Sequence, residues 1–274
     1  MPFTASHAAV VVPLARRGLI LSALVVGSMA PDLEYFLRLS FTSRYGHTLP
    51  GMFALSLPCG LAALWLFHAI LKRPLLTLLP ASHEQRLARY AGPFHFAPAR
   101  RFARILVSLM AGIVSHVVID AFTHEHGQVV DMIPMLGVPV GRIGGLVVPA
   151  YMALQAAATA VLSLVLLGQY WRWFRREPPA GDAPPFALER QLLVLFGFGS
   201  LAALLGFGYG ALGVRHLSGF DALHVFGGRA FIAAAATLGL ELFVFAVAMR
   251  WQADRAATLQ ASPATTREEG FHED

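Results

Sequence analysis

The sequence predicts an all-α, polytopic transmembrane bundle of about five or six spanning helices, and its composition is the first reason. Of its 274 residues, 56% are hydrophobic and only 14% are charged, whereas soluble domains carry about 25% charged residues. The mean hydropathy is +0.60. A chain of this length has too little interior to remove so much apolar surface from water. Part of that surface must therefore face lipid.

Continuous apolar runs are the second reason. A helix needs roughly 20 residues to cross about 30 Å of hydrocarbon. Runs of this length cover about 49–71, 102–121, 146–170, 191–213 and 229–250. They are continuous rather than alternating, which favours helices over barrel strands. A helix also satisfies its own backbone hydrogen bonds in lipid.

An earlier apolar stretch, 18–39, is interrupted by a proline and charged residues in its second half. If it spans completely, the N-terminus is cytoplasmic. If 3–14 and 18–31 instead form a re-entrant hairpin with Arg16 and Arg17 at its tip, the N-terminus returns to the outer side. A broken helix is tolerated at membrane depth only where protein or a wet cavity surrounds it. The sequence leaves both arrangements open.

Basic residues alternate between the connections, as the positive-inside rule requires. The connections 72–101 and 171–190 and the segment after the last run hold most of them, whereas 122–145 and 214–228 hold few. We therefore expect a cytoplasmic C-terminus. These loops explain the net charge of +5. We find no aromatic-interleaved basic patch that would indicate a nucleic-acid partner.

The chain is predicted to form one transmembrane domain over 1–255. Within it, 72–101 is a basic cytoplasmic loop and 175–189 is a linker rich in proline and glycine. Residues 256–274 have the composition of a disordered tail. The single cysteine, Cys59, cannot form an intramolecular disulfide.

The third apolar run carries His116, Asp120 and His124 at spacings of four. Each step turns the side chain by about 40° and lifts it about 6 Å, so the three form one polar stripe. Neighbours at i and i+4 can hold one metal ion, and imidazole with carboxylate suits zinc, iron or manganese. His124, about 12 Å from His116, would serve a second metal or the rim of the site. The alternative is a structural cluster that hydrogen-bonds to neighbouring helices.

Two further candidates precede this run. Pro31 disfavours helix at Ala30, so a break is expected there. Asp32 then either points into a site or caps the following turns. Glu34 cannot share a helix face with Asp32, and we interpret it as a solvated interfacial charge. His47 lies in a turn-rich stretch on the expected outer face, where Asp32 could also lie.

These segments resemble an uncharacterised family of bacterial multi-pass membrane proteins that is known only as a domain of unknown function. The segments are Met1-Pro2-Phe3-Thr4-x-Ser6-His7, Gly27-Ser28-Met29-Ala30-Pro31-Asp32-Leu33-Glu34-Tyr35-Phe36, His47-Thr48-Leu49-x-Gly51 and His116-x-x-x-Asp120-x-Phe122-Thr123-His124. The match covers residues 1–130 well. The remainder matches mainly through its hydropathy.

The order of these residues also resembles that of membrane-bound metal-dependent hydrolases, and of the zinc-dependent phospholipase C and P1-nuclease group. The resemblance implies six metal ligands: His7, Asp32, His47, His116, Asp120 and His124. It further implies that Asp120 bridges two metal ions and that Asp32 and Asp120 serve the catalytic centre. The chain departs from the pattern because no clear second helix offers a His-x-x-x-Glu pair.

We therefore expect a membrane-embedded, metal-dependent hydrolase with zinc as its cofactor. The resemblance to the bacterial family implies a location in the bacterial cytoplasmic (inner) membrane. Its partners would be membrane lipids, and its substrate a lipid or lipid-linked (phospho)ester reached from the outer face. The alternative is a transporter or a metal-binding structural membrane protein, because intramembrane His and Asp also mark ion and proton paths. An enzyme needs at least three ligands around one point and an open position. A transporter would distribute its polar groups through the whole bilayer.

Overall fold

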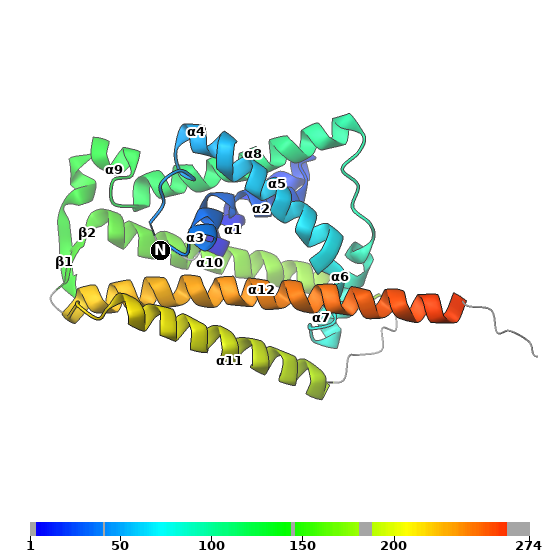
Figure 1. Cartoon of the computed structure of the whole chain (residues 1–274). Coiled ribbons are helices and arrows are strands. Elements are labelled where there is room, and N and C mark those ends of the chain that lie inside the picture. The colour runs from blue at the N-terminus through cyan, green and yellow to red at the C-terminus, as the bar shows by residue number, and fades with distance from the viewer. Residues whose placement is uncertain (1–3, 41, 144–145, 181–187, 262–274) are drawn as a thin grey trace, which may run out of the picture.

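The chain folds into an elongated bundle of helices that run alongside one another (Figure 1). This computed structural model describes residues 4–40, 42–143, 146–180 and 188–261. By length and composition, five of its helices can cross a membrane: Leu49–Leu76, Ala99–Thr123, Ala150–Arg176, Leu188–Gly213 and Gly219–Thr258. Apart from one small β-hairpin, the described residues form helices and their connections. The predicted all-α polytopic bundle is confirmed.

The N-terminal residues form a hairpin of short helices. Its first arm comprises η1 (Thr4–His7), α1 (Ala8–Val11) and η2 (Val12–Arg17), and its second comprises α2 (Leu21–Gly27), η3 (Ala30–Asp32) and α3 (Leu33–Arg38). Gly18 turns the chain between the arms at a φ of +86°, a conformation that favours glycine. The Arg104 side chain donates a hydrogen bond to the Gly18 carbonyl. Residues 4–38 thus form a hairpin with Arg16 and Arg17 at its tip, and the side of the membrane on which its N-terminus lies stays a prediction.

The next segment is one long helix with two π-helical turns. It comprises α4 (Leu49–Gly51), η4 (Met52–Ser56), α5 (Leu57–Leu66), η5 (Phe67–Leu71) and α6 (Lys72–Leu76), of which η4 and η5 are the π-helical turns. The predicted basic loop then contains α7 (Ala81–Leu87) and η6 (Ala88–Ala91) before α8 (Ala99–Thr123) begins. The π-helical turns η4 and η5 belong to a rare type of turn that often occurs at functional sites.

The connection after α8 is more structured than the sequence indicates. It contains α9 (Gln128–Met132), η7 (Pro134–Gly137) and an antiparallel hairpin of β1 (Pro139–Ile143) and β2 (Leu146–Pro149). The second strand takes the first residues of the run predicted as helix over 146–170. The helix α10 (Ala150–Arg176) begins only after Pro149, because proline is poorly tolerated inside a helix.

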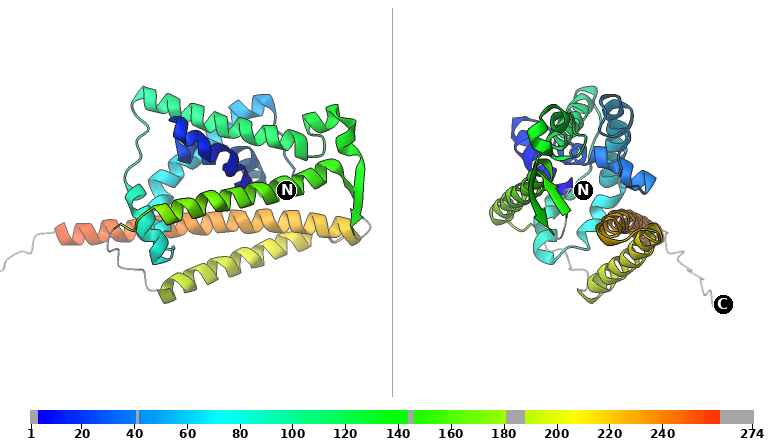
Figure 2. Two further views of the ribbon diagram at one scale, coloured as in Figure 1. Left: turned by 180° about the vertical axis from the view of Figure 1, so that it is seen from behind. Right: turned by 90° about the vertical axis from the view of Figure 1, so that its left-hand side faces the viewer.

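The last two helices, α11 (Leu188–Gly213) and α12 (Gly219–Ala261), pack against each other along one side of the bundle (Figure 2). Their close approach requires Gly206, since an added Cβ would lie 2.6 Å from the Ala230 carbonyl oxygen. The 43 residues of α12 extend beyond the predicted run at both ends. At 1.5 Å per residue the helix is about 64 Å long, roughly twice the hydrocarbon thickness.

Two segments predicted to lack regular structure lie partly outside the described residues. Helix α12 continues to Ala261, so the predicted tail is helical over its first residues, and 262–274 are not described. Helix α10 continues to Arg176 within the predicted linker, of which 181–187 are not described. Both helices therefore continue beyond the ends of the apolar runs that predicted them.

Close packing between α2 and α8 fixes the position of the hairpin. A Cβ added at Gly27 would lie 2.2 Å from the Leu109 carbonyl oxygen, and one at Gly112 would lie 2.4 Å from that of Leu24. Only glycine permits such backbone contact. Beside it lies a buried core of Ala23, Leu64, Ile105 and Leu109. The contact places Ser28, the residue after α2, against the second half of α8.

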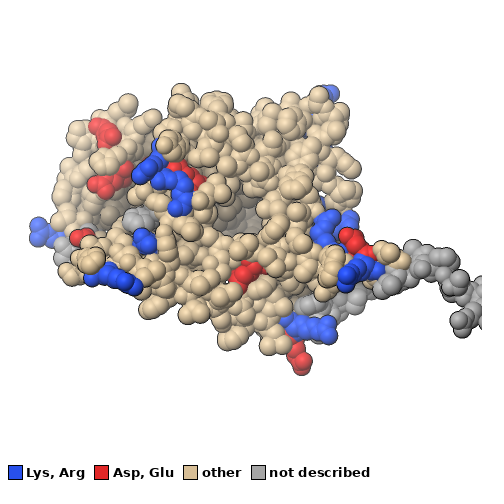
Figure 3. All heavy atoms as spheres, viewed as in Figure 1, with Lys and Arg blue, Asp and Glu red and all other residues tan. Residues whose placement is uncertain are grey.

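The surface has the character expected of an integral membrane protein. On the face in Figure 3, charged side chains gather towards the two ends of the molecule, and the band between them is mostly uncharged. Leu164, Phe196 and Leu204 on α10 and α11 are 68%, 75% and 67% exposed. Such apolar side chains are stable at the surface because lipid surrounds them. Which end faces the cytoplasm remains a prediction from the charge distribution.

Candidate metal centre

Helix α8 carries two candidate ligands on one buried face. The side chains of His116 and Asp120 are 0% and 8% exposed. Their i, i+4 spacing brings His116 Nε2 to 3.2 Å from Asp120 Oδ2. This face is buried because the N-terminal hairpin covers it through the glycine contact between α2 and α8.

The hairpin contributes a third candidate, Asp32. It ends η3, directly after the break expected at Pro31. Asp32 occupies the N-cap position of α3 but makes no capping hydrogen bond with its side chain. Its Oδ1 instead lies 3.4 Å from His116 Nε2, and its Oδ2 accepts a hydrogen bond from Thr4. The side chain of Asp32 is therefore directed into the site rather than to the helix end.

The loop that presents His47 is held by the carboxylate of Glu34. Three consecutive backbone N–H groups donate to it, from Arg44, Tyr45 and Gly46 at 2.9, 3.0 and 2.7 Å. Glu34 is only 2% exposed, so its interpretation as a solvated interfacial charge is wrong. Burial raises the pKa of Glu34, but these hydrogen bonds and an ion pair outweigh burial and lower it to about 2.

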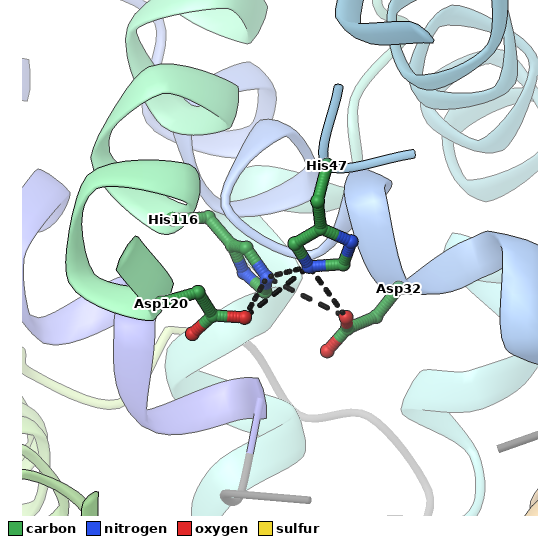
Figure 4. Close-up of side chains that lie close together, drawn as sticks. All are labelled: Asp32, His47, His116 and Asp120. Carbon is green, nitrogen blue, oxygen red and sulfur yellow. Dashed lines mark hydrogen bonds and ion pairs between the residues drawn. The ribbon is translucent and has the colours of Figure 1, made fainter. Parts of the chain in front are cut away.

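Four side chains from these three segments point towards one another (Figure 4). His47 Nε2 lies 3.4 Å from Asp32 Oδ1 and 3.2 Å from Asp120 Oδ2. His47 Nε2 and His116 Nε2 are 3.1 Å apart. One ligand atom from each of Asp32, His47, His116 and Asp120 lies within 4.8 Å of the other three. This cluster could hold a metal ion.

The hydrogen bonds behind the two rings fix the tautomer that each ring takes when it is neutral. His116 Nδ1 lies 2.8 Å from the Ser28 carbonyl oxygen, which can only accept, so Nδ1 carries the hydrogen. Ser43 Oγ donates to Glu34 at 3.1 Å and therefore accepts from His47 Nδ1 at 2.9 Å. In both neutral rings Nε2 presents a lone pair. The four converging atoms are then all acceptors, which suits a cation.

His7 and His124, the other ligands implied by the resemblance, face the second oxygen of Asp120. His7 Nε2 and His124 Nδ1 lie 3.7 and 3.5 Å from Asp120 Oδ1. The His7 ring also stacks on that of His116, with centroids 4.4 Å apart. Neither belongs to the four-residue cluster. The hairpin thus brings His7, 113 positions from Asp120 in the sequence, to the same carboxylate.

Three supporting residues escaped the sequence analysis in whole or in part. Glu34 organises the His47 loop, Ser43 joins Glu34 to His47, and Gln155 on α10 lies 3.1 Å from His124 through its Nε2. Arg38, four residues after Glu34, was a signal that Glu34 is paired, and the pair forms at 2.6 Å. Nothing in the sequence pattern distinguishes Ser43 from other loop serines.

With this geometry established, the comparisons with known proteins give one match. The sequence model of a family described as "Domain of unknown function (DUF4184)" matches residues 1–249. The chain belongs to this family. No curated protein and no solved structure matches it. The DUF4184 match includes the N-terminal hairpin, the four-residue cluster and all but the end of the last spanning helix.

Proposed function

We propose that this DUF4184 chain is a membrane-embedded, metal-dependent hydrolase that acts on a lipid or lipid-linked phosphoester from the outer face. The observation that supports it most is the convergence of two imidazole Nε2 atoms and two carboxylate oxygens within 4.8 Å. Zinc is the proposed metal, because it takes nitrogen and oxygen ligands in sets of three or four.

Charge balance supports the same conclusion. Asp32 and Asp120 are nearly buried, with side chains 6% and 8% exposed. Among the described residues, no Lys or Arg forms an ion pair with either carboxylate. Burying two negative charges without compensation is costly. One divalent cation held between the carboxylates and two neutral rings would balance them.

A second ion at the other oxygen of Asp120 is proposed on independent grounds. Asp120 Oδ1 and His7 Nδ1 are buried and form no hydrogen bond within the part of the chain described. His7 Nε2 and His124 Nδ1 both lie within 3.7 Å of that oxygen. Asp120 would then bridge two ions, with Oδ2 towards His47 and His116 and Oδ1 towards His7 and His124.

The chemistry that this site could perform is hydrolysis. A bound divalent metal lowers the pKa of a coordinated water towards about 7 and polarises a phosphoryl oxygen. The chain supplies the ligand frame, in which His116 and Asp32 are closed off while the side chains of His47 and His124 are 21% and 30% exposed. These two exposed imidazoles mark the side from which a substrate would enter.

The position of the site suggests the substrate class. Asp120 lies one turn before the end of α8 at Thr123, so the site is close to one end of a spanning helix. The phosphoester of a lipid lies at this depth, where the hydrocarbon meets the headgroup region. A soluble substrate would not need a site set against spanning helices.

The proposal is tested with purified wild-type protein and two variants, Asp120→Asn and the matched control Asp131→Asn in the exposed outer segment. Metal content is measured by plasma mass spectrometry, and hydrolysis is measured on phospholipid vesicles and on a soluble aryl phosphodiester. We expect bound zinc and lipid hydrolysis in the wild type and in Asp131→Asn. Asp120→Asn should lose both. Equal metal content in all three proteins would overturn the proposal.

The transporter alternative predicts a different result. Transport would require polar groups along the bilayer, whereas the converging ligands gather around the end of α8. Zinc flux into proteoliposomes that depends on Asp120, without hydrolysis of any phosphoester, would favour the transporter. Metal retention without flux or hydrolysis would favour a structural metal site.

A further inference from the structure

A second site lies at the opposite end of α10 and is independent of the metal centre. A groove of about 480 Å³ separates η2 from the last turns of α10. Three guanidinium groups line it, those of Arg16, Arg172 and Arg176. Among the described residues none of the three forms a hydrogen bond or ion pair. The acidic residue of the groove, Glu177, is paired with Arg89.

The groove continues as an apolar channel along the same face of α10. A second hollow of about 390 Å³ shares Gln169 and Arg172 with the first and is otherwise lined by Val161, Leu164, Val165 and Gly168. Spacings of three and four place these residues and Arg176 on one helical stripe. From Val161 to Arg176 the stripe is about 22 Å long at 1.5 Å per residue.

The groove is thus charged at one end and apolar along the rest of its length, as a phospholipid has a charged headgroup and apolar acyl chains. We propose that this groove binds an anionic phospholipid, with its phosphate among Arg16, Arg172 and Arg176 and an acyl chain along Val161–Gly168. The arginines match the headgroup charge, and guanidinium groups bind phosphate through paired hydrogen bonds. Leu164 and Val161 are 68% and 57% exposed, so an acyl chain of a surrounding lipid can reach them.

One further residue of the groove fits a lipid at this depth, and another fixes the wall of the groove. Trp173 lines the groove beside the arginines, and tryptophan favours the headgroup region. Gln169 donates through Nε2 to the Ala9 carbonyl at 3.0 Å, while its buried Oε1 has no hydrogen-bond partner within the described chain. Because that oxygen is buried, Gln169 holds α10 against the first arm of the hairpin and does not face the lipid.

The groove also lies at the end of the bundle where basic residues gather. Arg86 of the basic connection donates to the Phe174 carbonyl at 3.1 Å, which places this connection against the end of α10. Figure 2 shows the N-terminal hairpin, in dark blue, against α10, in green. A lipid bound here would join the tip of the hairpin to α10, and so would stabilise the hairpin that carries His7.

The test compares retention of phosphatidylglycerol and phosphatidylcholine with identical acyl chains by native mass spectrometry. The groove variant Arg16→Gln/Arg172→Gln is set against Arg17→Gln/Arg175→Gln, which removes the same charge from neighbours that do not line the groove. We expect the wild type to retain phosphatidylglycerol preferentially. The groove variant should lose affinity by about five-fold per arginine, as for basic residues near an anionic membrane surface. The matched control should bind as the wild type does.

Gly168→Trp tests the acyl channel without altering charge. A Cβ at Gly168 would meet no atom within 4 Å, so a larger side chain is accommodated on the outer face. This variant should fold normally and lose the bound lipid. Equal losses in both arginine pairs, equal retention of the two lipids, or displacement by millimolar inorganic phosphate would each overturn the proposal. Because no step depends on metal content or hydrolysis, its failure is distinct from failure of the hydrolase proposal.

Discussion

The Nε2 atoms of His47 and His116 lie 3.1 Å apart, although in the neutral rings neither carries a hydrogen that could join them. Each ring donates its Nδ1 hydrogen to oxygen on the far side, at Ser43 Oγ and at the Ser28 carbonyl. Two lone pairs at this distance repel each other unless a positive charge lies between them. A metal ion between the two atoms would remove this repulsion, and so would protonation of the rings beside Asp32 and Asp120, so the metal content of the protein separates the two cases.

Removal of metal should lower the stability of the protein. Metal at about one hundred times its dissociation constant stabilises a native state by about 2.7 kcal/mol. We expect a chelator to lower the melting temperature of the detergent-solubilised wild type and added zinc to restore it. Unfolding is monitored by tryptophan fluorescence. Asp120→Asn should melt at one temperature with or without chelator. An unchanged wild-type melting curve after complete metal removal would contradict a bound ion.

Ser43→Ala should weaken metal binding without removing a ligand. Ser43 accepts from His47 and donates to Glu34, so it fixes the orientation of the ring. Loss of such an outer hydrogen bond typically costs about 10–100-fold in metal affinity. Competition with a chromogenic chelator measures the change. Ser40→Ala, in the same loop but without contact to His47, is the control and should leave the affinity unchanged.

Gly112→Ala should disrupt the site from a distance. The added methyl would lie 2.4 Å from the Leu24 carbonyl oxygen, so α2 must move away from α8. Overpacking of this kind costs about 1–3 kcal/mol. We expect a lower melting temperature together with weaker metal binding, because Ser28 moves away from His116. Gly199→Ala meets no atom within 4 Å and should be neutral or slightly stabilising; a similar loss in that variant would count against the explanation.

His124→Ala should distinguish one metal ion from two. Under the proposed bridging role of Asp120, this variant retains the ion held by His47 and His116 and loses its neighbour. His124 can bind through Nδ1 when two contacts change: Gln155 turns its amide so that the oxygen faces Nε2, and the Thr123 hydroxyl gives up its 3.3 Å contact with Nδ1. The metal content per chain should fall by half. A wild-type content of one ion, unchanged in His124→Ala, would limit the centre to the four-residue cluster.

The bundle could be predicted from the sequence because lipid imposes long apolar runs, and these runs locate the spanning helices. The pair His116 and Asp120 could also be predicted, since their spacing alone places them on one face of a helix. For Asp32, the break at Pro31 left two roles open, a site residue or a helix cap. These are local properties of the chain, and hydropathy or helical periodicity reports them directly.

The role of Glu34 could not be predicted, because it depends on a loop folding back over it. The loop delivers three backbone N–H groups to that carboxylate, and such a contact has no periodic signal in the sequence. The place of His7 required a choice between two topologies that hydropathy fits equally well. The β-hairpin was missed because its second strand continues into an apolar helix without a change in composition.

The N-terminal hairpin packs on α8 through backbone contact at Gly27 and Gly112, beside a buried core to which Ala23 of α2 and Leu109 of α8 belong. If this contact does not form, His7, Asp32 and Ser28 lie out of reach of α8. Metal content in a purified sample would then serve as a quality assay: it would report the fraction of molecules in which the hairpin has inserted correctly, before any substrate is known.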